Sequence, residues 1–254
     1  MESASSRESW SGVGPAVIAV RNDSRVAKLV VRERPAAGEP AGLLILHHGR
    51  GADELDLLGL ADALDPARRL HVAAPRGPLR LPGSPGYHWY RVPRVGYPDA
   101  ASFHAAYDDL AAVHDSLWEH TTIEPSRTVL GGFSMGSVMS YALGLAPLRP
   151  APAGILAFSG FIPVVEGWRP SPADRPGLRA FIAHGRRDPV IEVGFARRAR
   201  DELQAAGLDV SYHESDAAHH IDPAQVPLAG AWLQSTLGPG EMPDGGRAQA
   251  SERR

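Results

Sequence analysis

The residues of this chain best placed to do chemistry are a serine between two glycines, in the pattern Gly132-x-Ser134-x-Gly136. An apolar run over 126–130 precedes it, and a helix-like run over 135–146 follows it. A strand, a tight turn and a helix are the setting that a nucleophile elbow requires. Such a turn strains the backbone of the serine, and only glycine fits where neighbouring segments approach so closely. The pattern therefore predicts a nucleophilic Ser134, with an ordinary turn serine as the alternative.

A nucleophilic serine needs a base and an acid that orients the base, because a hydroxyl reacts poorly at neutral pH. In chains with this elbow the order is serine, then aspartate or glutamate, then histidine. Asp188 follows an apolar run over 178–184, and His219 follows one over 208–213. Both would lie beyond the carboxyl ends of strands, from where they can converge on Ser134. Order and placement together predict a catalytic triad of Ser134, Asp188 and His219.

The acid and the base also have plainer interpretations. Asp188-Pro189 is an ordinary turn opener. His219 and His220 could be surface residues, or half of a metal site together with Asp222. No further cluster of His, Asp or Glu at ligand spacing accompanies them, so we predict no metal site and no cofactor.

Backbone amides are the expected donors to the negative oxygen that develops when an acyl carbonyl is attacked. The first donor is the N–H of Met135, directly after the nucleophile. The second is expected in the loop that follows the apolar run 42–47, where Gly49 and Gly51 allow a sharp turn. We predict the N–H of Arg50, with that of Gly51 as the alternative. The pattern leaves open whether the Arg50 side chain faces solvent or guards the entrance.

Short apolar runs alternate with longer amphipathic ones along the chain, which is typical of a mostly parallel sheet with helices on both faces. We predict one α/β domain over 15–237, a flexible segment at 1–14 and a disordered tail at 238–254. The expected strands are 16–21, 27–33, 42–47, 70–74, 126–131, 154–158, 178–184 and 208–213, and the expected helices are 53–64, 99–120 (with Asp99 as its cap), 135–146, 193–206 and 224–236.

Two connections, 75–98 and 159–177, are too long to be plain links. Both are rich in proline and aromatic residues, and both follow strands, where ligands bind in open α/β sheets. Neither is long enough for a separate lid domain. We therefore expect an open groove that suits short-to-medium acyl chains, although the aromatic residues around Trp89 could equally serve simple packing.

The composition of the chain argues against several classes of function. A net charge of −3 gives no bulk field that favours nucleic acid or an anionic membrane. The chain has no cysteine, which removes disulfides and thiolate catalysis and fits a reducing compartment, so we expect a cytoplasmic protein. Neither a signal peptide nor an apolar run of membrane-spanning length is present, and we expect no stable membrane insertion. The oligomeric state is left open between a monomer and a homodimer.

Several stretches, in order, resemble the phospholipase/carboxylesterase family of α/β-hydrolases, which includes acyl-protein thioesterases and small bacterial carboxylesterases. The resemblance covers about residues 27–236. It implies the α/β-hydrolase fold without a lid, the triad and oxyanion donors named above, and Trp89 and Phe161 near the acyl pocket; we add the neighbouring Ile162 as substrate-binding. The matching stretches are 48–53 (His-Gly-Arg-Gly-Ala-Asp), 87–90 (Tyr-His-Trp-Tyr), 131–137 (Gly-Gly-Phe-Ser-Met-Gly-Ser), 158–160 (Phe-Ser-Gly), 184–190 (His-Gly-Arg-Arg-Asp-Pro-Val) and 218–221 (Ala-His-His-Ile).

These observations predict a serine hydrolase that cleaves carboxylic esters or thioesters through an acyl-enzyme. A small-molecule acyl ester or thioester is the expected partner. Dienelactone-hydrolase-like activity is an alternative on the same fold, although without a cysteine nucleophile, and peptidase activity is another. A catalytically silent binding module is the alternative from a different class, and an intact triad argues against it.

Overall fold

The computed structural model describes residues 16–22 and 25–238, with side chains from Leu29 onward. The expected flexible segment 1–14 and all but Gly238 of the expected tail lie outside the described residues, so those boundaries stay predictions. Among the described residues, no helix is both long and apolar enough to cross a lipid bilayer.

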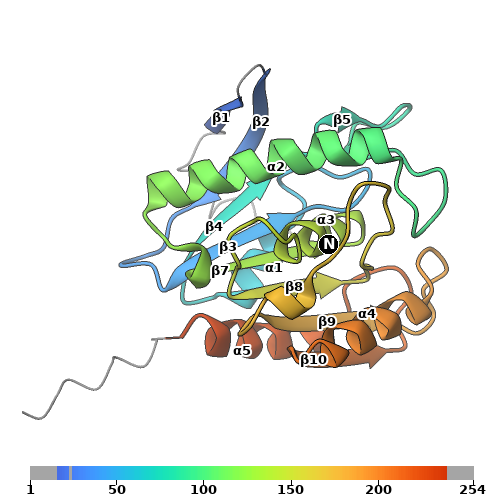
Figure 1. Ribbon diagram of the computed structural model, residues 1–254. Coiled ribbons are helices and arrows are strands. Elements are labelled where there is room, and N and C mark those ends of the chain that lie inside the picture. The colour runs from blue at the N-terminus through green and yellow to red at the C-terminus, as the bar shows by residue number, and fades with distance from the viewer. Residues whose placement is uncertain (1–15, 23–24, 239–254) are drawn as a thin grey trace, which may run out of the picture.

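One eight-stranded sheet forms the centre of the fold (Figure 1), in the order β1-β2-β4-β3-β7-β8-β9-β10. The strands from β4 to β10 in this order run parallel, whereas β1 and β2 form an antiparallel edge. The mostly parallel α/β sheet predicted from the sequence is therefore confirmed. The strands are β1 (Ala16–Asn22), β2 (Arg25–Arg34), β3 (Gly42–His47), β4 (Leu70–Pro75), β7 (Thr128–Phe133), β8 (Gly154–Phe158), β9 (Arg179–Gly185) and β10 (Asp209–Ser215).

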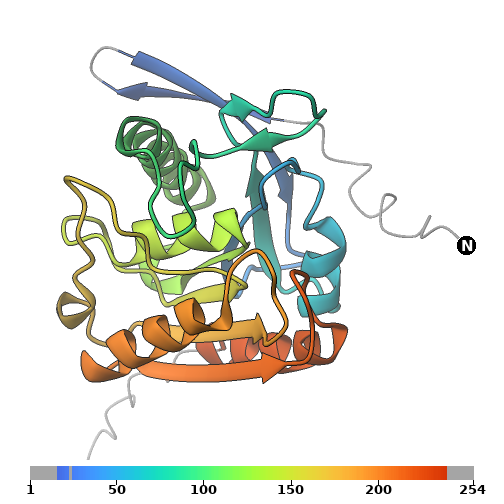
Figure 2. The same cartoon turned by 90° about the vertical axis from the view of Figure 1, so that its right-hand side faces the viewer.

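Helices cover both faces of the sheet (Figure 2), because alternate residues of the central strands are apolar on each side. In β3, Leu43 and Ile45 pack under α2 and α3, whereas Leu44 and Leu46 pack under α1 and α5. The helix α4 shares the face of α3. The helices are α1 (Leu58–Leu64), α2 (Ala100–Thr121), α3 (Met135–Gly144), α4 (Val193–Ala205) and α5 (Val226–Thr236).

Helix α2 shows how local sequence sets an element's limits. The Asp99 carboxylate accepts a hydrogen bond from the Ser102 N–H at 3.0 Å, which confirms the predicted cap. At the other end Thr122 adopts the left-handed conformation that ends many helices.

Three expected elements begin two or more residues later than predicted. The helix expected from residue 53 begins at Leu58, because the Asp53 side chain accepts from the Leu55 N–H and closes a turn instead. The strand expected from residue 126 begins at Thr128, after a 3₁₀ turn that starts at Pro125. The helix expected from residue 224 begins at Val226, after a 3₁₀ turn over Pro223–Gln225.

The long connection 75–98 contains a small antiparallel hairpin that the sequence analysis did not predict. Its strands are β5 (Leu79–Arg80) and β6 (Tyr87–His88). Strands of two residues are too short to show a period of two. Tyr87 of this hairpin forms backbone hydrogen bonds with Gly51 and Ala52 in the loop after β3.

Candidate active site

Ser134 occupies the tight turn between β7 and α3, in a backbone conformation that is rare for a residue with a side chain (φ 54°, ψ −118°). Glycine is required at both flanking positions, because neighbouring backbone groups leave no space for a Cβ atom. A Cβ atom on Gly136 would overlap the carbonyl group of His47, and one on Gly132 would overlap the backbone of Gly136. The strained turn lifts the serine off the end of β7 and points the first turn of α3 toward it.

Asp188, His219 and Ser134 form one continuous chain of hydrogen bonds. The Nδ1 atom of His219 lies 2.6 Å from Asp188 Oδ2, and its Nε2 atom lies 2.8 Å from Ser134 Oγ. An ionised carboxylate can only accept, so the imidazole donates through Nδ1 and leaves Nε2 free to accept from the serine hydroxyl. The structure thus brings together the three residues that the sequence analysis selected, in the arrangement that activates a serine.

The Asp188 side chain is completely buried, and its charge is balanced by fixed donors. Oδ1 accepts from the N–H groups of Val190 and Ile191, both at 2.8 Å. His184, at the end of β9, lies 3.4 Å from Oδ2 and donates through the same nitrogen to the Ile191 carbonyl at 2.8 Å. Burial lowers the pKa of His184, which keeps it neutral beside the carboxylate. These contacts hold Asp188 in one rotamer.

Two backbone amides, those of Met135 and Arg50, are the candidate donors of an oxyanion hole for a carbonyl attacked by Ser134. Met135 is the first residue of α3, so its N–H has no carbonyl within the helix to bond. In the loop after β3, the N–H of Gly51 donates to the Tyr87 carbonyl at 2.8 Å and is already occupied. This contact favours Arg50, rather than the alternative Gly51, as the second donor. Arg50 is exposed, which is compatible with both of the roles considered for its side chain.

The loop after β3, residues 48–52, is fixed by contacts from far along the chain. His48 donates through Nδ1 to the Gly49 carbonyl at 2.7 Å and accepts through Nε2 from the Gly77 N–H at 2.9 Å. The Trp89 indole donates to the His48 carbonyl at 2.9 Å, and the Tyr87 N–H donates to the Ala52 carbonyl at 2.8 Å. The β5–β6 hairpin and the residues beside it therefore hold the proposed oxyanion loop in place.

These supporting roles were not predicted from the sequence. His48, Tyr87 and His184 all lie in the stretches that carry the family resemblance, which was the available signal. Behind the site, His47 is fully buried between Ser140 and His114, 2.9 Å from Ser140 Oγ and 3.2 Å from His114 Nε2. Burial lowers the pKa of His47 to about 3, so this ring is neutral at ordinary pH.

The three expected substrate-binding residues take different positions. The Trp89 side chain has no exposed surface, which differs from the expectation that it lines an open groove. Phe161 is buried in the same apolar cluster as Trp89 and Met135. Ile162 is half-buried and lines a hollow of about 440 Å³ together with residues 163–170 and Glu202 of α4. Of the three, Ile162 is the one that lines this hollow, and its role in substrate binding stays a prediction.

The buried Trp89 leads to a prediction about turnover. Trp89→Phe keeps most of the ring volume but removes the hydrogen bond to the His48 carbonyl. We expect kcat to fall about tenfold to a hundredfold for short and long acyl chains alike, because every substrate uses the same oxyanion donors. Steady-state kinetics on acetyl and octanoyl esters would measure this.

Trp118→Phe is the matched control, since Trp118 also donates one hydrogen bond, to Thr128 Oγ1 at 2.9 Å, but from helix α2. If Trp89→Phe lowers kcat only for the longer acyl chains, this role is contradicted. Trp89 would then be interpreted as part of the wall of the acyl pocket.

Comparison with known proteins gives a consistent result. The model of the phospholipase/carboxylesterase family matches residues 30–237. The chain is 28% identical over 204 residues to acyl-protein thioesterase 1 of Yarrowia lipolytica, covering 73% of this chain and 87% of that protein. The crystal structure of esterase PE8 superposes with a TM-score of 0.68 at 28% identity, over 82% of this chain and 99% of the esterase. The Bacillus cereus carboxylesterase gives 0.71 at 24% identity, over 82% and 94%.

Proposed function

The chain belongs to the phospholipase/carboxylesterase family, and from that premise we propose that it hydrolyses carboxylic esters or thioesters through an acyl-enzyme formed on Ser134. The observation that carries the proposal is the unbroken chain of hydrogen bonds from Asp188 through His219 to Ser134, at 2.6 and 2.8 Å. A silent binding module would have no need to keep a strained serine at hydrogen-bond distance from an oriented imidazole.

The reaction follows from the positions of these atoms. His219 Nε2 takes the hydroxyl proton as Ser134 Oγ attacks the acyl carbonyl. Asp188 holds the ring by Nδ1 and stabilises the imidazolium that forms. The N–H groups of Met135 and Arg50 donate to the negative oxygen, and each such donor contributes roughly 10²–10³ in kcat. His219 then protonates the leaving alcohol or thiol, and it activates the water that releases the acid.

Exposed apolar side chains favour an acyl substrate. Val92 and Tyr97 lie on the connection after β4, Val164 on the one after β8, and Val190 on the one after β9. The first two connections meet where the Val164 N–H donates to the Gly96 carbonyl at 3.3 Å. Because carboxyl ends of parallel strands share one edge of the sheet, all three connections begin on the edge that carries Ser134. We expect these side chains to bind a short-to-medium acyl chain in an open groove.

A panel of p-nitrophenyl esters with acetyl, butyryl, octanoyl and palmitoyl groups, run beside the matching acyl thioesters, tests this function. We expect turnover of the soluble esters and thioesters, with no jump in rate when substrate passes from monomers to micelles, because no lid has to open. A fluorophosphonate probe should label the same protein on Ser134.

The panel can also contradict the proposal. No turnover of any ester or thioester, together with no labelling by the probe, would favour the silent binding module. Labelling with cleavage of peptides alone would favour the peptidase alternative. A sharp activation at micelles would contradict the open groove while leaving the serine mechanism in place.

A further inference from the structure

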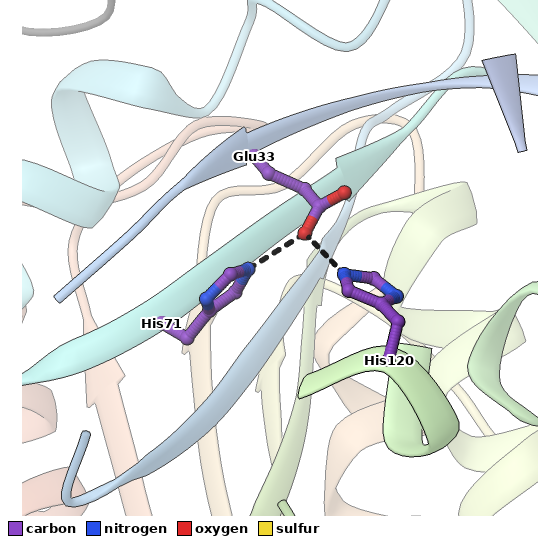
Figure 3. Close-up of side chains that lie close together, drawn as sticks. All are labelled: Glu33, His71 and His120. Carbon is purple, nitrogen blue, oxygen red and sulfur yellow. Dashed lines mark hydrogen bonds and ion pairs between the residues drawn. The ribbon is translucent and has the colours of Figure 1, made fainter. Parts of the chain in front are cut away.

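Two imidazoles meet on one carboxylate oxygen (Figure 3), and the three residues lie far apart in the sequence. Glu33 Oε2 lies 2.7 Å from His71 Nε2 and 3.0 Å from His120 Nε2. Glu33 lies on β2, His71 on β4 and His120 in the last turn of α2. The three ligating atoms all lie within 4.8 Å of one another, and no other such group of three or more His, Cys, Asp or Glu occurs among the described residues.

The hydrogen bonds of His120 show which atoms face the carboxylate. Its Nδ1 atom lies 2.9 Å from the Ser116 carbonyl, which can only accept, so Nδ1 carries a proton. A neutral His120 then turns the lone pair of Nε2 toward the Glu33 oxygen at 3.0 Å. Two acceptors at this distance repel each other unless a positive charge lies between them. That charge is either a second proton on the imidazole or a metal ion bound by both groups.

The surroundings match what a metal ion requires. Two imidazoles and one carboxylate suit zinc and the neighbouring divalent transition metals. Bond lengths near 2.1 Å in a tetrahedral site would set the ligand atoms about 3.4 Å apart, so the contacts of Glu33, now 2.7 and 3.0 Å, would have to open by about 0.7 and 0.4 Å. Metal-binding histidines typically donate their other N–H to a carbonyl, as His120 does to Ser116. The His120 side chain is 44% exposed, which leaves room for a water ligand.

We propose that Glu33, His71 and His120 bind one divalent transition-metal ion of the zinc type, which ties the end of α2 to the neighbouring strands β2 and β4. The site is structural. His71 is the second residue of β4, near its amino end, whereas Ser134 follows the carboxyl end of β7. The two sites therefore lie at opposite ends of the sheet, and ester turnover should not depend on the ion.

Calorimetric titration of Zn²⁺ into tag-free, chelator-treated protein tests the proposal. We expect one site in the wild type, and its loss in His120→Gln and in Glu33→Gln. His104→Gln is the matched control, because His104 lies on the same helix and its Nε2 contacts the Glu166 carbonyl instead of a carboxylate. Co²⁺ in place of Zn²⁺ should give visible absorption bands that His120→Gln removes and His104→Gln keeps.

Thermal unfolding gives a second readout that does not depend on activity. At a free Zn²⁺ concentration about 100 times Kd, we expect the wild-type Tm to rise by roughly 5–10 °C and the Tm of His120→Gln to stay unchanged. If Glu33→Gln fails to fold, His120→Gln still decides, because His120 is exposed at a helix end. The proposal would be overturned if the wild type binds neither Zn²⁺ nor Co²⁺, or if His120→Gln and Glu33→Gln both still bind them. The contact between Glu33 and His120 would then be explained by a second proton on the imidazole.

Discussion

Replacing Ser134 with alanine is expected to lower kcat roughly 10⁴–10⁶-fold while leaving the fold intact. The hydroxyl oxygen is the atom that attacks, and the remaining oxyanion donors can only assist a direct attack by water. Alanine keeps the Cβ atom that the strained turn already accommodates, so no new clash arises at φ 54°. Steady-state kinetics on a p-nitrophenyl ester, with Tm measured on the same preparation, would check both parts of the prediction.

The matched control for this variant is Ser126→Ala, an exposed serine before β7 in the same stretch of chain. It should keep full activity and full labelling by a fluorophosphonate, whereas Ser134→Ala should lose both. Residual activity of more than a few per cent in pure, folded Ser134→Ala would show that another group carries the reaction.

Alanine substitutions of the adjacent residues His219 and His220 are expected to have very different effects on kcat. His219→Ala should lose activity on the scale of Ser134→Ala, because Nε2 of this ring is the atom 2.8 Å from the serine oxygen. His220→Ala should keep nearly full activity, because its side chain is exposed and belongs to neither link of the triad. The kcat values of the two variants on one ester would decide.

His220→Ala serves here as the control for His219→Ala, since the two changes remove the same ring one residue apart. An inactive His220→Ala beside an active His219→Ala would mean that the loop after β10 adopts a different register in solution. Loss of wild-type ester turnover on chelation, with recovery on adding metal, would favour the alternative in which His219, His220 and Asp222 hold a metal.

Much of the fold was predictable because its signals are local. Each buried strand is a short apolar run, as in β3 and β8, whose bounds match the prediction at both ends. The predicted first residue of an element was wrong where the chain forms a turn before it, as at Asp53 before α1 and at Pro125 before β7. The β5–β6 hairpin was missed because two-residue strands carry no periodic pattern.

The sequence by itself selected Ser134, Asp188 and His219, since each follows a strand whose carboxyl end the fold places at one edge of the sheet. Only the tertiary structure shows that the Gly51 N–H is occupied, because the Tyr87 carbonyl that accepts from it comes from a hairpin 36 residues further on. It also buried Trp89 under that loop. The meeting of Glu33 with His71 and His120, 38 and 87 residues away, depends on strand register and helix packing, which no local pattern encodes.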